Sequence, residues 1–76
     1  MTVYEVHEIH FLRPGDGSGT HVVPFRRQLF ATETLAEAER TRLDLRSSDP
    51  AVIAARRLVG IDTVEVRVAP VDVLER

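Results

Sequence analysis

Two histidines and a glutamate are the side chains of this 76-residue sequence best suited to metal chemistry. Pairing Leu12 with His21 in a hairpin would place His10 and His21 on one face as diagonal neighbours. Glu8 would share that face only if no bulge intervenes. Imidazoles and carboxylates ligate transition metals, but zinc sites in proteins take three or four protein ligands. We therefore expect a solvated or capped histidine pair and no functional metal.

The glycine-rich stretch from Gly15 to Gly19 is a second chemical candidate. Successive free backbone amides can form an anion-binding nest. A phosphate-binding loop, however, must open a helix and carries Gly-Lys-Ser/Thr, whereas this stretch joins two predicted strands and the sequence has no lysine. Its single acid, Asp16, is too little for a calcium loop. We expect a mobile hairpin tip here rather than a ligand cradle.

Nucleophilic catalysis has candidates by residue type alone. Ser18, Ser47 and Ser48 fall in predicted loops, with no Gly-x-Ser-x-Gly elbow and no strained turn that places one beside a histidine. The absence of cysteine excludes disulfides, thiolate metal sites and cysteine nucleophiles. A small single-layer sheet also offers little room for a pocket of about 300 Å³ or more. We expect no enzymatic activity, no catalytic residue and no cofactor.

Nucleic-acid binding requires a basic face, and the formal net charge of −2 opposes one. The basic clusters are the pairs Arg26-Arg27 and Arg56-Arg57. Adjacent residues of a strand point to opposite faces, so the first pair is not one patch. All ten basic residues are arginine, which we attribute to a GC-rich genome such as that of an actinobacterium or one of its phages. A small nucleic-acid-binding regulator is therefore the alternative, not the leading, hypothesis.

The composition, 43% hydrophobic and 29% charged, is that of a globular chain. No apolar run approaches the roughly 18 residues that cross a bilayer. The start, from Met1 to Glu5, lacks the basic and apolar regions of a signal peptide. We expect an intracellular, cytoplasmic protein that forms a single α+β domain over residues 1–76.

The elements that must position these side chains are predicted as follows. Residues 3–12 and 20–31 read as two strands of a hairpin, because they are rich in β-branched and aromatic residues. The apolar alternation of the first strand changes phase near His7-Glu8, which favours a bulge there over a strand covered on both faces. Pro24 places the second strand at a sheet edge. Residues 61–69 alternate cleanly as a third strand that Pro70 ends, and the tail could add a short edge strand or simply pack.

Two helices are predicted between the second and third strands. Thr34-Leu35-Ala36-Glu37 has the pattern of a capping box, so we expect a helix from about Leu35 to Arg46. Asp49 as N-cap, Pro50 at the first position and Gly60 after the end define the other helix. The predicted fold is a small three-stranded sheet in the order β-β-α-α-β, with two helices packed on one face and the first strand in the centre. If the helices run up and back, the first and last strands are parallel.

The helices carry the main anomaly of the sequence. Glu39 and Arg42 lie in the middle of the apolar arc of the first helix, where they can pair with each other. In the second helix, the predicted core face leaves Ile53 outside, flanked by Arg56 and Arg57. Either Ile53 packs under the tail, for instance against Leu74, or it is the apolar centre of an interface with an arginine rim.

Short chains bury little surface, about 60% of that exposed by the unfolded chain. Without disulfides, such a chain gains stability from good packing or from association. The sequence therefore predicts a non-enzymatic interaction protein that binds a protein partner or itself, most simply as a homodimer. The predicted interface residues are Ile53, Arg56, Arg57, Glu39 and Arg42. As a regulator or a phage-borne, host-directed factor, such a protein would need no active site.

Overall fold

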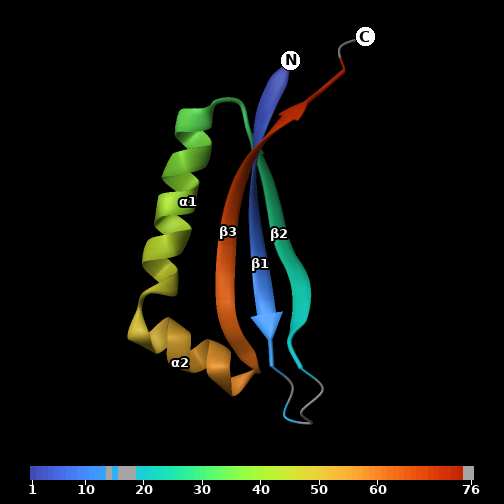
Figure 1. The fold of residues 1–76 in the computed structure, drawn as a ribbon. Helices are drawn as coiled ribbons and strands as arrows, with labels where there is room; N and C mark the ends of the chain where they lie inside the picture. The colour runs from blue at the N-terminus through green and yellow to red at the C-terminus, as the bar shows by residue number, and fades with distance from the viewer. Residues whose placement is uncertain (14, 16–18, 75–76) are drawn as a thin grey trace.

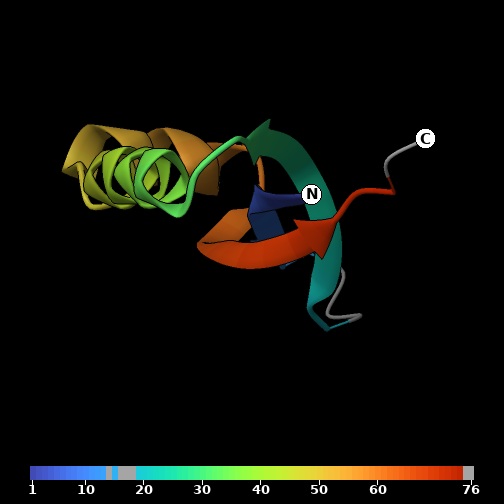
Figure 2. The ribbon, with the colours of Figure 1, turned by 90° about the horizontal axis from the view of Figure 1, so that it is seen from above.

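The computed structural model describes residues 1–13, 15 and 19–74. Its elements are β1 (Thr2–Leu12), β2 (His21–Phe30), α1 (Glu33–Ser47), α2 (Pro50–Leu58) and β3 (Ile61–Asp72). They form one antiparallel sheet in the order β2-β1-β3, with both helices on the same face (Figures 1 and 2). The predicted α+β class, the β-β-α-α-β order and the central first strand are confirmed.

The two helices are arranged as an L rather than as an up-and-back pair (Figure 1). α1 runs alone along the length of the sheet, and α2 turns across the end where β3 begins. We expected parallel first and last strands if the helices ran up and back. They are antiparallel, because only α1 runs along the length of the sheet, and β3 therefore begins at the end where β1 finishes.

The sheet contains a bulge, but on the strand next to the predicted one. Glu8 pairs with Arg26 and Ile9 pairs with Pro24, so Phe25 is the extra residue on β2. β1 keeps an unbroken alternation against β3 from Thr2 to Phe11. The predicted phase change within the first strand is therefore wrong: one strand face carries alternate residues up to His10, including two polar ones.

Those alternate residues of β1 face the helices. The core beneath α1 consists of Val6, Ala36 and Leu43, and the half-buried residues that pack against it are Tyr4, Phe30, Val66 and Val68. Ile9, on the opposite face of β1, is only 5% exposed. Among the described residues, Val6, Ile9, Ala36 and Leu43 are the only buried hydrophobic side chains, each 5% exposed or less. The core is as thin as the chain length predicts.

Proline does not end β3, contrary to the sequence-based prediction. Val73 N donates to Met1 O at 2.7 Å and Met1 N donates to Val73 O at 3.2 Å, so these residues form a hydrogen-bonded pair. Such pairs recur at every second residue of an antiparallel ladder, which leaves the pair Tyr4–Pro70 without ladder bonds. The missing N–H of Pro70 therefore lies on the outer side of an edge strand, where it disrupts nothing.

The helix boundaries are set by two caps. At α1, the Leu35 amide donates to the Thr32 hydroxyl at 3.3 Å, and Thr32 has an extended backbone. The predicted N-cap Thr34 is wrong, since it is already the second residue of the helix. At α2, the Ala51 amide donates to the Asp49 carboxylate at 2.9 Å and Pro50 opens the helix, as predicted. Gly60 follows with a φ of +84°, a conformation that favours glycine.

Candidate functional site

A hollow of about 330 Å³ is formed by residues of all three strands together with residues of α1 and α2. It is lined by Glu8, His10, Phe25, Arg26, Leu43, Arg46, Arg56 and Ile61. The hollow exceeds the roughly 300 Å³ for which so small a fold was expected to offer little room. The L-shaped helix pair accounts for it, because α1 packs over the upper sheet while α2 turns away across the end.

The floor of the hollow is a buried pair of polar side chains. Glu8 and His10 are 5% and 7% exposed, and His10 Nε2 lies 2.7 Å from Glu8 Oε2. They share a strand face because β1 is regular there, which meets the condition set from the sequence for Glu8. Burial of these polar groups is tolerated because each gives the other a hydrogen-bonding partner.

Phe25 forms one wall of the hollow. Its ring stacks on the His10 imidazole with a centroid separation of 4.2 Å and an interplanar angle of 16°. The bulge places Phe25 there, since it is the unpaired residue between the partners of Glu8 and Ile9. The side chain is nevertheless 61% exposed. One face of the Phe25 ring is fixed by the His10 imidazole, and much of the side chain is exposed to solvent. Such a ring is suited to stacking against a flat ligand group.

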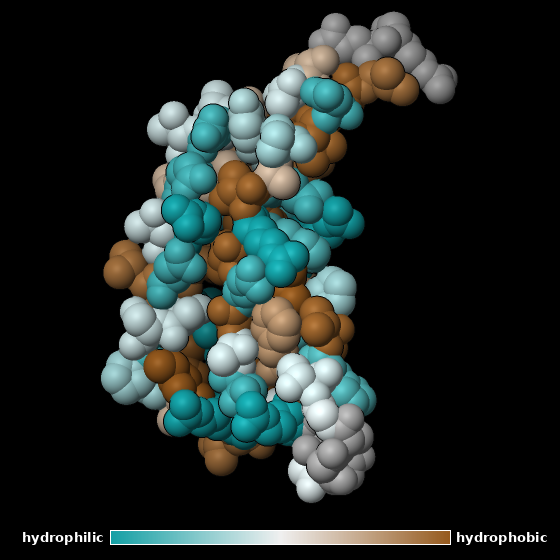
Figure 3. Space-filling model, viewed as in Figure 1, coloured by the Kyte–Doolittle hydropathy of each residue, from teal (hydrophilic) through white to brown (hydrophobic). Residues whose placement is uncertain are grey.

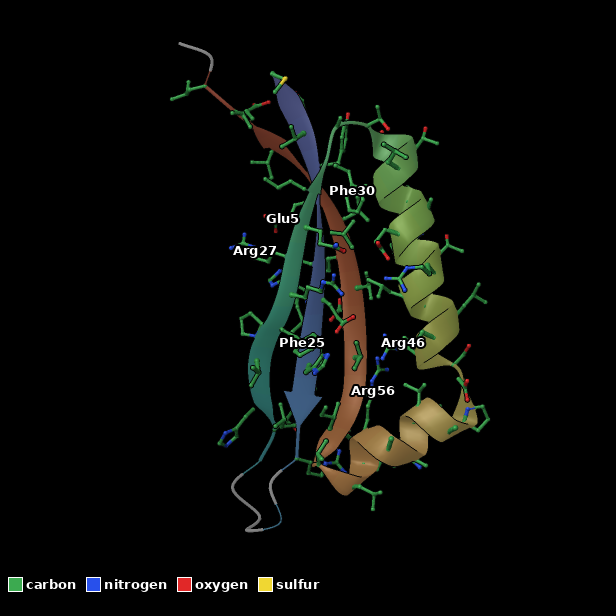
Figure 4. The ribbon with its side chains drawn as sticks, turned by 180° about the vertical axis from the view of Figure 1, so that it is seen from behind. Glu5, Phe25, Arg27, Phe30, Arg46 and Arg56 are labelled. Atoms are coloured by element: carbon green, nitrogen blue, oxygen red, sulfur yellow. The ribbon has the colours of Figure 1, made fainter. Side chains whose placement is uncertain are left out.

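Arginines from three different elements surround the rest of the hollow. Arg26 comes from β2, Arg46 from the last turn of α1 and Arg56 from the last turn of α2. Figure 4 shows Arg46 and Arg56 reaching from the helices toward the sheet at the level of Phe25. Arg56 Nη1 donates to the Ser47 hydroxyl at 2.9 Å, which fixes it across the α1–α2 corner.

The side chains that line the hollow combine an acid, an imidazole, an aromatic ring and three arginines. An imidazole beside a carboxylate is a combination used for proton transfer, and among the described residues no serine, threonine or tyrosine lines the cavity as a possible nucleophile. Within the described residues there is also no group of three or more His, Asp or Glu side chains placed to hold a metal ion. His21 pairs with Leu12 and His10 with Val23, the register expected from the sequence.

The face of the sheet opposite the helices carries two ion pairs, Glu5–Arg27 and Glu65–Arg67. Arg27 Nη2 contacts both Glu5 carboxylate oxygens, at 2.9 and 3.1 Å, and Arg67 contacts both oxygens of Glu65 at the same two distances. The hydrogen bond from Arg67 lowers the pKa of Glu65, and the same bond raises the pKa of Arg67. His7 lies between these pairs, and its Nε2 is buried without a hydrogen-bonding partner.

The residues predicted to form an interface do not lie on one surface. Glu39 and Arg42 pair with each other, Nε to Oε1 at 2.5 Å, as predicted. Ile53 and Arg56 are half-buried on the inner side of α2, whereas Arg57 is exposed. Ile53 does not pack under the tail, since Leu74 is 94% exposed near the C-terminus, at the far end from α2 (Figure 1).

The predicted core face of α2 comprised Ala51, Val52, Ala54, Ala55, Leu58 and Val59. The outer side of the helix carries most of these residues, and only Val52 is half-buried. Ala51, Ala54, Ala55 and Leu58 are all exposed, Leu58 by 88%, and Val59 after the helix is 69% exposed. The predicted orientation of this helix is therefore wrong, although Val52 lies on the buried side as predicted. Its inner side is formed by Val52, Ile53 and Arg56, and Arg56 bonds to Ser47 across the corner.

Sequence reasoning missed the hollow itself. The signal available was Glu8 and His10 at a spacing of two in a strand, which puts an acid and an imidazole on one face. The contributions of Arg26, Arg46 and Phe25 depend on the bulge and on the angle between the helices. The sequence-based expectation for the stretch Gly15–Gly19 is not tested by the structure, because most of it lies outside the described residues.

No family model, curated protein or solved structure matches this chain. In the part of the chain that the structure describes, neither helix has the length and apolar character needed to cross a bilayer.

Proposed function

We propose that the protein is a non-enzymatic interaction protein that associates with a second copy of itself through the outer side of α2. One observation carries the proposal: the exposed residues Ala51, Ala54, Ala55 and Leu58 follow the i, i+3, i+4, i+7 spacing of a single helix face. An amphipathic helix normally turns such a stripe toward its own core. Here the stripe faces outward and an arginine of the same helix faces inward.

The small core supports the same conclusion. Eleven large hydrophobic side chains of the described residues are exposed, against four hydrophobic residues that are buried. Figure 3 shows apolar surface over the strands and at the end of the molecule that α2 occupies. Large exposed apolar areas mark interaction surfaces in soluble proteins. Four of the eleven lie on β2, and Leu58 lies on α2, where it continues the stripe of exposed alanines.

A second copy is the occupant that the stripe fits. In an antiparallel pair of α2 helices related by a two-fold axis, Leu58 lies against Ala51 of the other copy, and Ala54 lies against Ala55. The alanines allow close approach of the helices, and each leucine fills the space over an alanine. Arg57, exposed and without an ion pair among the described residues, then lies near the other copy's Asp49, an opposite charge.

The size of the stripe sets the expected affinity. Nine helical residues span only about 14 Å. A helix this short buries less than the roughly 800 Å² per partner of a standard interface. The exposed Val59, which directly follows Leu58, enlarges the apolar area. We therefore expect reversible association with a dissociation constant in the micromolar range, on the order of −8 kcal/mol.

Sedimentation velocity across a concentration series from about 1 to 300 µM tests the proposal. The parent protein should shift from monomer to dimer, and Leu58→Glu should remain a monomer, because a carboxylate would be buried against alanine. Leu74→Glu is the matched control, since Leu74 is equally exposed but lies at the other end of the molecule. It should dimerise like the parent. A parent protein that stays monomeric throughout, or equal behaviour of the two variants, would contradict self-association.

Binding to nucleic acid has less support. Two of the arginines on the open sheet face, Arg27 and Arg67, are each neutralised by a carboxylate, so that face offers no basic stripe to a phosphate backbone. A salt titration separates the two hypotheses. Apolar association changes little between 50 and 200 mM salt, whereas binding to a labelled oligonucleotide would weaken steeply over that range.

A further inference from the structure

We propose that the hollow between the sheet and the α1–α2 corner binds a small phosphate monoester whose organic part is apolar or aromatic. This site lies on the inner side of α2 and is separate from the outer stripe assigned to self-association. Its features are a rim of arginines, apolar walls and a floor whose only acid is already engaged.

The distribution of paired and unpaired arginines is the first argument. Five of the nine arginines in the described residues form ion pairs with carboxylates: Arg13, Arg27, Arg40, Arg42 and Arg67. The four without a carboxylate partner are Arg26, Arg46, Arg56 and Arg57, and the first three line the hollow. In a chain of net charge −2, positive charge is thus left uncompensated mainly at this one place.

The acid in the hollow does not neutralise these arginines. Glu8 lies on the floor, 5% exposed, with its carboxylate 2.7 Å from His10 Nε2. No ion pair joins Glu8 to an arginine in the described part of the chain. Three arginines without an ion pair among the described residues therefore line a cavity whose acid is engaged with His10. Planar, permanently charged guanidinium forks match the oxygens of a phosphate dianion.

The walls determine the rest of the ligand. Phe25, Leu43 and Ile61 contribute apolar surface, and the Phe25 ring is fixed by its stacking on His10. A volume of about 330 Å³ is at the lower end of small-molecule pockets. It suits a ligand such as a phosphorylated aromatic or short aliphatic alcohol.

Isothermal titration at constant ionic strength, with phenyl phosphate, inorganic phosphate and benzoate as probes, tests the proposal. We expect phenyl phosphate to bind more tightly than inorganic phosphate, and benzoate to bind more weakly than phenyl phosphate. Absence of binding by phenyl phosphate at millimolar concentration would overturn the site. Tighter binding of benzoate would overturn its assignment to phosphate.

Three arginine variants locate the binding. Arg46→Gln and Arg56→Gln should each raise the dissociation constant for phenyl phosphate about tenfold or more, the effect of losing a charge-assisted hydrogen bond. Arg57→Gln, which removes the same charge from the outer side of α2, should change it less than about twofold. Equal effects of Arg56→Gln and Arg57→Gln would mean general attraction of anions and would overturn the proposal.

Phe25→Ala separates the two halves of the ligand. Phe25 is exposed and outside the core, so the variant should fold like the parent. It should weaken phenyl phosphate binding while leaving inorganic phosphate binding unchanged within about twofold. Unchanged binding of phenyl phosphate to this variant would show that the organic group lies elsewhere, and would overturn the assignment of the walls.

Discussion

Glu8 and His10, two residues apart on the central strand, share a hydrogen bond of 2.7 Å on the helix-covered face of the sheet. The strand alternation brings them together, and burial makes each depend on the other, since no second hydrogen-bonding partner for either side chain is present among the described residues. This pair is the polar centre of a molecule whose apolar core lies higher up the same strand, around Val6.

Removing the acid should therefore destabilise the fold. We expect Glu8→Ala to lower the free energy of unfolding by about 1–3 kcal/mol, because His10 is left buried without its partner. Glu8→Gln keeps an acceptor oxygen and should lower it less. Urea denaturation of the parent and both variants measures this. If the alanine and glutamine variants unfold at the same urea concentration, the hydrogen bond is not what stabilises this pair.

The N-cap of α1 can be tested by comparing alanine variants of Thr32 and Thr34. Thr32→Ala should lower the free energy of unfolding by about 1 kcal/mol, since the hydroxyl of Thr32 accepts the Leu35 amide. In a domain of this size that corresponds to a fall in melting temperature of about 4–8 °C. Thr34→Ala, inside the first turn, should change it far less, and calorimetry of both variants decides between them. The reverse order would restore Thr34 as the cap.

The orientation of α2 predicts that its apolar residues divide into two classes. Ile53→Ala should lower the stability of the monomer by about 1–2 kcal/mol, because Ile53 is half-buried. Leu58→Ala should change it by less than about 0.5 kcal/mol, because Leu58 is a surface residue. Urea denaturation at a protein concentration low enough to prevent association isolates the monomer term. A larger loss for Leu58→Ala would mean that the helix is turned the other way.

The ion pair between Glu65 and Arg67 predicts a pH effect. The hydrogen bond from Arg67 holds the pKa of Glu65 below its ordinary value of 4.5. A carboxyl whose pKa is lower in the folded than in the unfolded chain contributes stability above the unfolded pKa, and this contribution is lost as the pH falls through the folded pKa. Both residues are exposed, so the contribution is small.

NMR titration of the Glu65 carboxyl tests this pH effect directly. Arg67→Gln should raise the Glu65 pKa toward 4.5, whereas Arg27→Gln, which removes the matching arginine of the other ion pair, should leave it in place. A Glu65 pKa that does not respond to Arg67→Gln would contradict the hydrogen bond as its cause.

Much of the fold was predictable because local signals decide it. Asp49 and Pro50 define the start of α2 without help from the rest of the chain, and Pro24 correctly indicated an edge strand. The choice between Thr32 and Thr34 was not local, since it depends on where β2 ends and the chain turns. Pro70 misled because its effect depends on which side of β3 faces β1, a matter of register.

The candidate site was less predictable for a geometric reason. α2 has apolar residues around most of its circumference, so periodicity alone did not fix which side of it would be buried. The angle between α1 and α2 decides this, and it also creates the hollow and brings Arg46 and Arg56 together. Only the pairing of Glu39 with Arg42 and the shared face of Glu8 and His10 followed from spacing within one element.

β1 lies between β2, the next strand in sequence, and β3, the last strand of the chain. This order affects the rate at which the sheet forms. The pairing with β2 closes a short loop, whereas the pairing with β3 joins residues 2–12 to residues 61–72. Closing the larger loop has the greater entropic cost, and long-range pairing slows folding. During synthesis the hairpin is complete before β3 exists, so one edge of β1 stays unpaired while both helices are made. A chaperone, or a second incomplete copy of the chain, could pair with this unpaired edge of β1.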